Sequence, residues 1–191
     1  MTSGDPSAGT RAEPIFHVVL HQPEIPNNTG NIGRTCVAVG AALHLVHPLG
    51  FEVSDKACRR AGLDYWPRLH VAHHDTWSEY SAAHHAARRI LFTARARTCL
   101  FDLELRPGDH LVFGKESVGL PPDILADPGA STVALPMLPG ERSLNLATVV
   151  TVALYEGVRQ LARRGHLDIH PSSTGLLLRP HPSPHPSSSP R

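Results

Sequence analysis

The residues that could carry chemistry gather in one stretch, residues 135–148, where an apolar and proline-rich loop leads into a helix. Arg142, Ser143 and Asn145 fall within four positions at the expected start of that helix. The first turn of a helix offers unpaired backbone N–H groups, and these bind anions and other small polar groups. We therefore predict that Ser143 and the helix-start amides bind a carboxylate or a ribose hydroxyl, while loop backbone groups hold an adenine edge.

Two further loops, residues 26–35 and 113–121, have the same polar character. In the first, Arg34 lies one turn into a helix and suits an RNA phosphate, although a capping turn with a surface arginine explains these residues equally well. In the second, Gly114 allows backbone to approach a ligand and Glu116 supplies a carboxylate. An ordinary strand-to-helix loop with a solvated Lys115–Glu116 pair is the simpler alternative there.

The elements that must position these loops alternate along the chain. This alternation predicts an α/β domain in which a mostly parallel sheet carries helices on both faces. Asn28 or Thr29 is expected to cap the first helix. All three polar loops follow strands, so they should meet beyond the carboxyl edge of the sheet, where such folds bind ligands. The expected strands are 15–20, 43–46, 69–72, 90–93, 111–113 and 132–135, and the main helices are 30–39, 76–89 and 143–164.

The 191 residues indicate one domain, residues 14–167, between ends that composition predicts to be disordered, residues 1–13 and 168–191. A net charge of +1 gives no general signal for a polyanionic partner, so an RNA-binding role must rest on local arginines. Three cysteines without a CxxC pair favour neither a zinc ribbon nor a disulfide framework. With no leader and no long apolar run, we expect a cytoplasmic protein without membrane contact.

Two surface features have more than one reading. Arg59 and Arg60, followed by Tyr65, suit a nucleic-acid backbone and a stacked base, but arginines that merely offset a helix dipole are an equal alternative. The pairs at 73–74 and 84–85 are histidines without a third ligand at a suitable spacing. We expect them to be exposed, and we predict no metal ligand anywhere in the chain.

Taken together, the three loops resemble those of the SPOUT methyltransferases, and most of all the small single-domain group that methylates the ribose 2′-hydroxyl at the wobble position of tRNA. The resemblance implies a deep C-terminal trefoil knot and bound S-adenosyl-L-methionine. It also implies a homodimer formed through the first and last helices, with the tRNA anticodon stem-loop as partner and cytidine or uridine as target. The segments that carry it are 23–34, 59–65, 113–121 and 136–146, within residues 16–164.

The resemblance also implies roles for individual residues. The catalytic residues would be Arg34, Asn145 and Glu116. The cofactor-binding residues would be Ala94, Gly114, Leu135, Met137, Ser143 and Leu144. The RNA-binding residues would be Asn31, Arg59, Arg60, Lys115, Arg142 and Tyr155. Because the pKa of arginine lies above about 12, we expect Arg34 to clamp a phosphate and polarise the hydroxyl rather than to act as a free base.

Three alternatives remain open from the sequence. The same chemistry could act on ribosomal RNA or on another tRNA position. A non-catalytic RNA-binding dimer could have kept the fold. A Rossmann oxidoreductase is the weakest alternative, because residues 27–35 lack the GxGxxG pattern.

Overall fold

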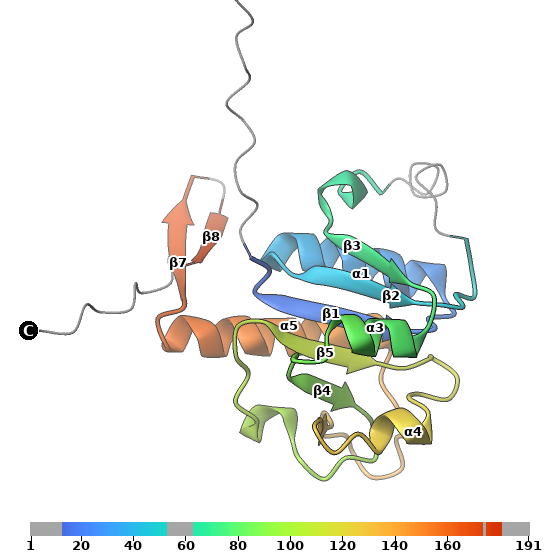
Figure 1. Cartoon of the computed structure of the whole chain (residues 1–191). Helices are drawn as coiled ribbons and strands as arrows, with labels where there is room; N and C mark the ends of the chain where they lie inside the picture. The colour runs from blue at the N-terminus through green and yellow to red at the C-terminus, as the bar shows by residue number, and fades with distance from the viewer. Residues whose placement is uncertain (1–12, 53–62, 174, 181–191) are drawn as a thin grey trace, which may run out of the picture.

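The computed structural model describes residues 13–52, 63–173 and 175–180, and its centre is a six-stranded sheet in the order β3-β2-β1-β5-β4-β6 (Figure 1). All five strand pairings in this sheet are parallel. The predicted α/β class is therefore confirmed, whereas the trefoil knot stays a prediction. The strands are β1 Phe16–His21, β2 Ala42–Val46, β3 Val71–His74, β4 Arg89–Phe92, β5 Asp109–Phe113 and β6 Ser131–Val133.

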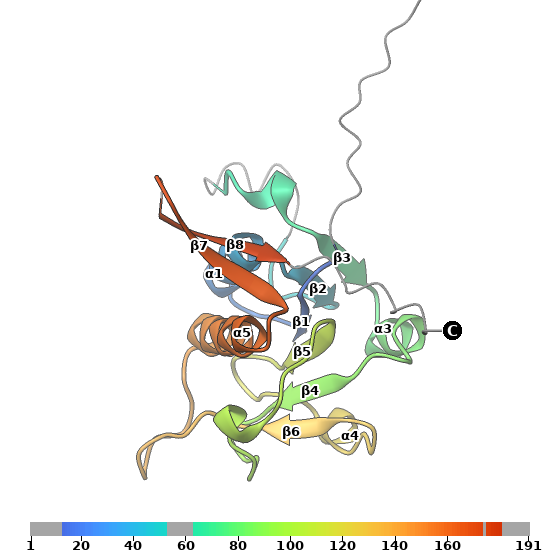
Figure 2. The ribbon, with the colours of Figure 1, turned by 90° about the vertical axis from the view of Figure 1, so that its left-hand side faces the viewer.

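Helices cover both faces of the sheet (Figure 2). On one face α1 (Pro26–Val39) and α5 (Leu146–Arg163) pack against each other and enclose the larger apolar core. A Cβ at Gly157 of α5 would lie 2.5 Å from the Phe16 ring, so this glycine lets α5 approach β1 closely. On the other face α3 (Trp77–Ala83) and α4 (Pro122–Leu125) cover a smaller core. Two short 3-10 helices, η1 (Trp66–Arg68) and η2 (Leu100–Asp102), lie in connections. None of the described helices is long and apolar enough to cross a bilayer.

The helix boundaries differ from the predicted ones at three places. The first helix begins at Pro26 without a side-chain cap, because proline is itself favoured in a first turn, so neither Asn28 nor Thr29 caps it. The last helix begins at Leu146, with Asn145 as its cap, so Ser143 lies before the helix rather than in its first turn. Helix α3 is shorter than expected: it ends at Ala83, with His84 as its C-cap.

The chain after α5 forms an antiparallel hairpin, β7 (Leu167–Ser172) and β8 (Gly175–Pro180). Composition predicts disorder from residue 168 onward, and this prediction is wrong for residues 168–172 and 175–180, which form the two strands. Composition suggested a low-complexity tail, but Leu167 is buried, Ile169 pairs with Leu178, and Gly175 adopts a φ of +127° at the turn. The expectation for residues 1–12 and 181–191 falls outside the described residues.

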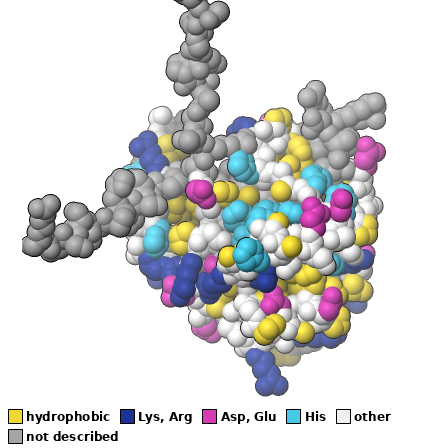
Figure 3. All heavy atoms as spheres, viewed as in Figure 1, with side chains coloured by type: hydrophobic (Ala, Val, Ile, Leu, Met, Phe, Trp, Pro, Cys, Tyr) yellow, Lys and Arg dark blue, Asp and Glu magenta, His cyan; other side chains and the backbone are white. Residues whose placement is uncertain are grey.

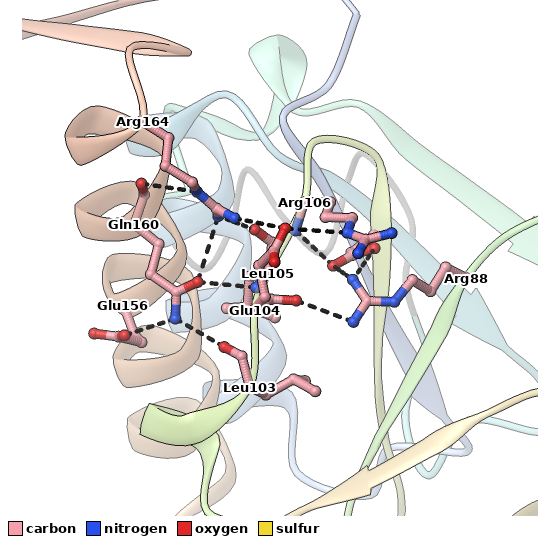
Figure 4. Close-up of polar contacts among 9 residues, drawn as sticks. Arg88, Leu103, Glu104, Leu105, Arg106, Glu156, Gln160 and Arg164 are labelled. Carbon is pink, nitrogen blue, oxygen red and sulfur yellow. Dashed lines mark hydrogen bonds and ion pairs between the residues drawn. The ribbon is translucent and has the colours of Figure 1, made fainter.

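The connection between β4 and β5 is fastened to α5 by polar side chains (Figure 4). The amide of Gln160 donates to the Leu103 carbonyl at 3.0 Å and accepts from the Leu105 N–H at 2.9 Å. Arg164 also donates to the Leu105 carbonyl, and Arg88 pairs with the buried carboxylate of Asp109 at 2.9 Å. These bonds fix the end of a loop whose earlier residues, 96–99, line a groove beside the carboxyl edge of the sheet.

Candidate active site

The three polar loops meet at the carboxyl edge of the sheet, as predicted. They follow β1, β5 and β6, and the first two of these strands are neighbours. A chain of side-chain hydrogen bonds joins the loops directly. The Asn145 amide donates to the Asn28 amide oxygen at 2.9 Å, and the Asn28 amide donates to Glu116 Oε1 at 3.0 Å. Residues that are far apart in sequence therefore form one connected polar network.

Glu116 is the centre of this network. Its Oε2 accepts from the backbone N–H of Glu24 at 2.8 Å, and its Oε1 accepts from the N–H of Ile25 at 3.3 Å as well as from Asn28. Each of these donors belongs to the loop after β1 or to the start of α1. A carboxylate with both oxygens engaged in this way holds a loop in place, so the geometry favours a positioning role for Glu116 over the predicted contact with substrate.

A reciprocal contact closes the same two loops. The Glu24 carboxylate accepts from the backbone N–H and from the hydroxyl of Ser117, each at 3.0 Å. These two hydrogen bonds lower the pKa of Glu24, because they stabilise its ionised form. The loops after β1 and β5 are thus held together by two carboxylates: Glu116 accepts hydrogen bonds from the loop after β1, and Glu24 accepts them from the loop after β5.

The turn after β5 depends on Gly114. A Cβ at this position would lie 2.1 Å from the Gly119 carbonyl carbon and 2.2 Å from the Leu120 nitrogen. The N–H of Lys115 donates to the Gly119 carbonyl at 3.2 Å, and the N–H of Gly119 donates back to the Lys115 carbonyl at 2.9 Å. The close backbone approach that Gly114 allows is therefore to its own loop.

Beside this network lies an open groove of about 390 Å³ between the loops that follow β4 and β6. This volume falls in the range of small-molecule sites. Three of the predicted cofactor residues, Ala94, Leu135 and Met137, line it, and the other three, Gly114, Ser143 and Leu144, do not. Ser143 and Leu144 are exposed on the approach to α5. The lining residues are 94, 96–99 and 134–141.

The groove offers the groups that S-adenosylmethionine needs. The backbone groups of Leu135 and Met137 make no hydrogen bond within the described residues, so their donors and acceptors are available to a purine edge. Apolar side chains of Leu135, Met137 and Leu138 stand beside those groups. The residues present therefore fit a cofactor held mainly by backbone contacts between apolar walls.

Arg34 stands apart from both the network and the groove. Its side chain is 66% exposed, its guanidinium lies 4.9 Å above the centre of the Tyr65 ring, and it is 3.9 Å from the Asp64 carboxylate. Tyr65 is only 3% exposed and its hydroxyl donates to the Gly30 carbonyl in α1. Of the two interpretations of this segment, the structure disfavours the one in which Tyr65 stacks on a base, because the ring is buried against α1 and lies under the Arg34 guanidinium.

The predicted RNA-binding residues that the structure describes lie on separate segments of the chain. Asn31 lies one turn before Arg34 on the exposed side of α1, and Arg142 is exposed in the loop before α5. Tyr155, on α5, is 52% exposed, and Lys115 is partly buried. Arg59 and Arg60 lie outside the described residues. None of these positions is joined to the Glu116 side chain by a hydrogen bond within the described residues.

Sequence reasoning missed the structural role of three residues, Glu24, Asn28 and Ser117. Glu24 is a charged residue within a short proline-rich connection directly after a buried strand, and Asn28 lies four positions later in the same loop and helix start. Polar residues directly after a buried strand are the signal that could have identified them, because functional groups in such folds gather at the carboxyl ends of the strands. Their partner across the sheet edge was not visible, since it depends on β1 and β5 being neighbours.

Comparison with known proteins gives a consistent result. Residues 15–155 match the SpoU rRNA methylase family. A tRNA (cytidine(34)-2′-O)-methyltransferase from Burkholderia ambifaria is 46% identical over 154 residues, which cover 79% of this chain and 99% of that protein. A solved structure described by its work on 2′-OH methylation of C/U34 in tRNA is 47% identical, with a TM-score of 0.73 over 78% of this chain and 97% of that one. A SpoU methyltransferase from Streptomyces viridochromogenes, solved with AdoMet, is 26% identical, with a TM-score of 0.67 over 84% of this chain and 63% of that one.

Proposed function

Because the chain belongs to the SpoU rRNA methylase family, we propose that it methylates the ribose 2′-hydroxyl of nucleotide 34, cytidine or uridine, in tRNA, with S-adenosylmethionine as methyl donor. The observation that carries the tRNA substrate is the 46% identity to the Burkholderia enzyme, which extends over nearly all of that protein. The match at the carboxyl edge of the sheet includes the groove and all three polar loops, since it covers residues 15–155.

S-adenosylmethionine supplies a methyl group that is already activated by the positive sulfur. The protein therefore has to align the ribose oxygen with that methyl and to help the hydroxyl lose its proton. Leu135 and Met137 would hold the cofactor through their backbone groups and apolar side chains. Glu116 and Asn145 act as positioning residues, because they hold the loop after β1 and the start of α5 in register with the groove.

Arg34 is the candidate for the contact with the reacting nucleotide. Its guanidinium is exposed and packs over the face of the Tyr65 ring, which orients it toward solvent. A charged guanidinium has five donors and no acceptor. Arg34 would therefore clamp the phosphate next to the target ribose and polarise its 2′-hydroxyl, while a phosphate oxygen or a water takes the proton.

The proposed enzyme is a homodimer. Within one chain Arg34 contacts Asp64 and Tyr65 rather than the Glu116 network. An active site that combines Arg34 with this network would therefore take its arginine from a second copy of the chain. A pairing of two copies through α1 and α5 would bring the exposed Arg34 and Tyr155 into the neighbourhood of the other copy's loops. We place the reaction in the cytoplasm with tRNA, and the activated methyl needs no metal ion for its transfer.

The test is methylation of tRNA by the purified protein, followed by nucleoside mass spectrometry and mapping of the modified position. We expect a 2′-O-methylated pyrimidine at position 34 that depends on both the protein and S-adenosylmethionine. Methylation at another tRNA position, or of ribosomal RNA alone, would contradict the proposal. Cofactor binding without methyl transfer to any RNA would favour the non-catalytic dimer instead.

Two substitutions of Arg34 define its role in that assay. We expect Arg34→Ala to lose at least about 100-fold in rate, since the reacting groups are no longer aligned. Arg34→Lys should keep measurable activity if a positive charge near the phosphate is sufficient. If Lys is as inactive as Ala while folding and tRNA affinity are unchanged, the planar guanidinium itself is required.

A further inference from the structure

A group of histidines lies on the face of the sheet that α3 covers. His17, His44, His74 and His110 come from four different strands, and His84 ends α3 above them. Side chains alternate along a strand, and the parallel register places His17 beside His110. Histidine side chains are gathered near the centre of this face in Figure 3. The expectation of exposed histidines is therefore wrong for His74, which is buried, and for His84, which is partly buried, whereas His73 and His85 are exposed as expected.

The ring nitrogens of these histidines lie at distances suited to one metal ion. His17 Nδ1 and His44 Nε2 share a hydrogen bond of 2.9 Å, and His44 Nδ1 and His74 Nε2 share one of 3.0 Å. An ion bound between His17 and His44 would replace the proton they share, which leaves to solvent, and the two nitrogens would move apart by a few tenths of an ångström. In a tetrahedral site with metal–nitrogen bonds near 2.1 Å, neighbouring nitrogens are about 3.4 Å apart. Two sets of three have ligand atoms that all lie within 4.8 Å of one another: His17, His44 and His110, and His44, His74 and His84.

The kind of ligand indicates the kind of ion. A neutral imidazole nitrogen is the usual histidine ligand for Zn²⁺, Cu²⁺ and Ni²⁺, whereas Mg²⁺ and Ca²⁺ prefer oxygen ligands. A set of three imidazoles therefore favours a divalent transition-metal ion.

The first set has the better support around it. Its three residues lie on adjacent strands, β2, β1 and β5, so the sheet itself fixes their spacing. The Tyr80 hydroxyl is 2.7 Å from His110 Nδ1, and this contact orients the ring and leaves Nε2 for a ligand. Metal-binding histidines are commonly oriented in this way through their second nitrogen. His17 is only partly buried, which leaves an approach for the ion and for a water as fourth ligand.

We propose that His17, His44 and His110 form a binding site for one divalent transition-metal ion, with Zn²⁺ as the expected occupant. The site lies on the α3 face, whereas the groove residues 94, 96–99 and 134–141 lie beyond β4 and β6. Its role is structural: an ion bound to the folded chain but not to the unfolded one stabilises the fold, and it ties β1, β2 and β5 together at the centre of the sheet.

The test is equilibrium dialysis of the full chain against Zn²⁺, with the bound metal counted by elemental mass spectrometry. The chain carries no affinity tag in this experiment, and a His181→Asn/His185→Asn variant removes two histidines of the C-terminal segment as possible ligands. We expect one ion per chain in both proteins, together with a rise in melting temperature on adding Zn²⁺. No binding above that of the exposed histidines would overturn the proposal.

Single substitutions then identify the ligands. His110→Ala and His17→Asn should each weaken Zn²⁺ binding at least about tenfold, whereas His84→Ala, which removes a member of the second set alone, should not. The opposite pattern would assign the ion to the second set and contradict the proposal as stated. Because His110 is buried and its loss could disturb folding, circular dichroism is measured alongside, and the partly exposed His17 serves as the second variant. His85→Ala is the matched control, because His85 is exposed, follows His84 directly and belongs to neither set of three histidines.

Discussion

The loop network at the carboxyl edge and the histidine group under α3 are built in opposite ways. The network consists of short loops whose side chains hold backbone N–H groups, as Glu116 holds Glu24 and Ile25. The histidine group consists of side chains on strands, fixed in place by the pairing of those strands. The first is sensitive to local backbone shape and the second to burial and packing. Substitutions should therefore affect activity in one region and stability in the other.

The largest effect is expected from Gly114→Ala. The added methyl group would meet backbone atoms of Gly119 and Leu120 at 2.1–2.4 Å, so the turn must open and Glu116 must shift. A displacement of about 1 Å at a reacting site can cost about 100-fold in rate, and we expect a loss of at least that size. Methyl transfer to tRNA measures it.

The matched control for this change is Gly108→Asn at the opposite edge of the sheet. Gly108 has a φ of +80° but open space around a Cβ, and asparagine tolerates that backbone conformation. We expect this variant to keep near-normal activity. If the two variants lost activity equally, the loss in Gly114→Ala could not be assigned to crowding in the turn after β5.

An intermediate effect, on stability alone, is expected from Tyr80→Phe. The change removes the hydroxyl that contacts His110 Nδ1 at 2.7 Å and leaves a buried nitrogen without its partner. An unpaired buried polar group costs about 1–3 kcal/mol. Urea denaturation of the metal-free protein should show a loss of that size, with methyl transfer unchanged. A large loss of activity in the folded variant would mean that the two regions are coupled.

The smallest effect is expected from Glu24→Gln, and it depends on pH. The Ser117 hydroxyl and N–H lower the pKa of Glu24 in the folded protein. A carboxylate with a lowered pKa stabilises the fold above its unfolded pKa, and that contribution is lost as the pH falls through the folded value. The stability of the variant should therefore decline less steeply than that of the wild type as the pH falls below about 4.5.

Glu141→Gln, whose side chain makes no hydrogen bond or ion pair within the described residues, is the control. Parallel pH curves for Glu24→Gln and wild type would mean that the Glu24–Ser117 contact is absent in solution.

The same contrast explains what could be predicted from sequence. Loop motifs are contiguous, so the stretches around Gly114 and Asn145 were visible, and so was their place at the carboxyl edge. Strand order is not contiguous, and the pairing of β1 with β5 is needed before Glu24 can be matched with Glu116 or His17 with His110. The spacing of the histidine pairs along the chain predicts no metal site, whereas the three histidines that the structure brings together are residues 17, 44 and 110.

The remaining differences have local causes. The expected caps of the first helix were chosen for their side chains, while Pro26 begins it through its fixed backbone angle. The hairpin of β7 and β8 was hidden by a composition rich in proline, serine and histidine, although Leu176, Leu177 and Leu178 form an apolar run in its second strand. This run pairs with residues five to nine positions earlier in the chain, since Leu176 lies opposite Pro171 and Leu178 opposite Ile169.

The interlocked carboxylates of Glu24 and Glu116 have a consequence for how this protein can change through evolution. Each one accepts hydrogen bonds from the loop that carries the other. A substitution in one loop therefore removes a hydrogen-bond partner of the carboxylate in the other. Asn28 and Asn145 extend the same dependence to the start of α5. Among descendants of this chain, substitutions at positions 24, 28, 116, 117 and 145 should arise in correlated sets, while neighbouring surface positions vary independently.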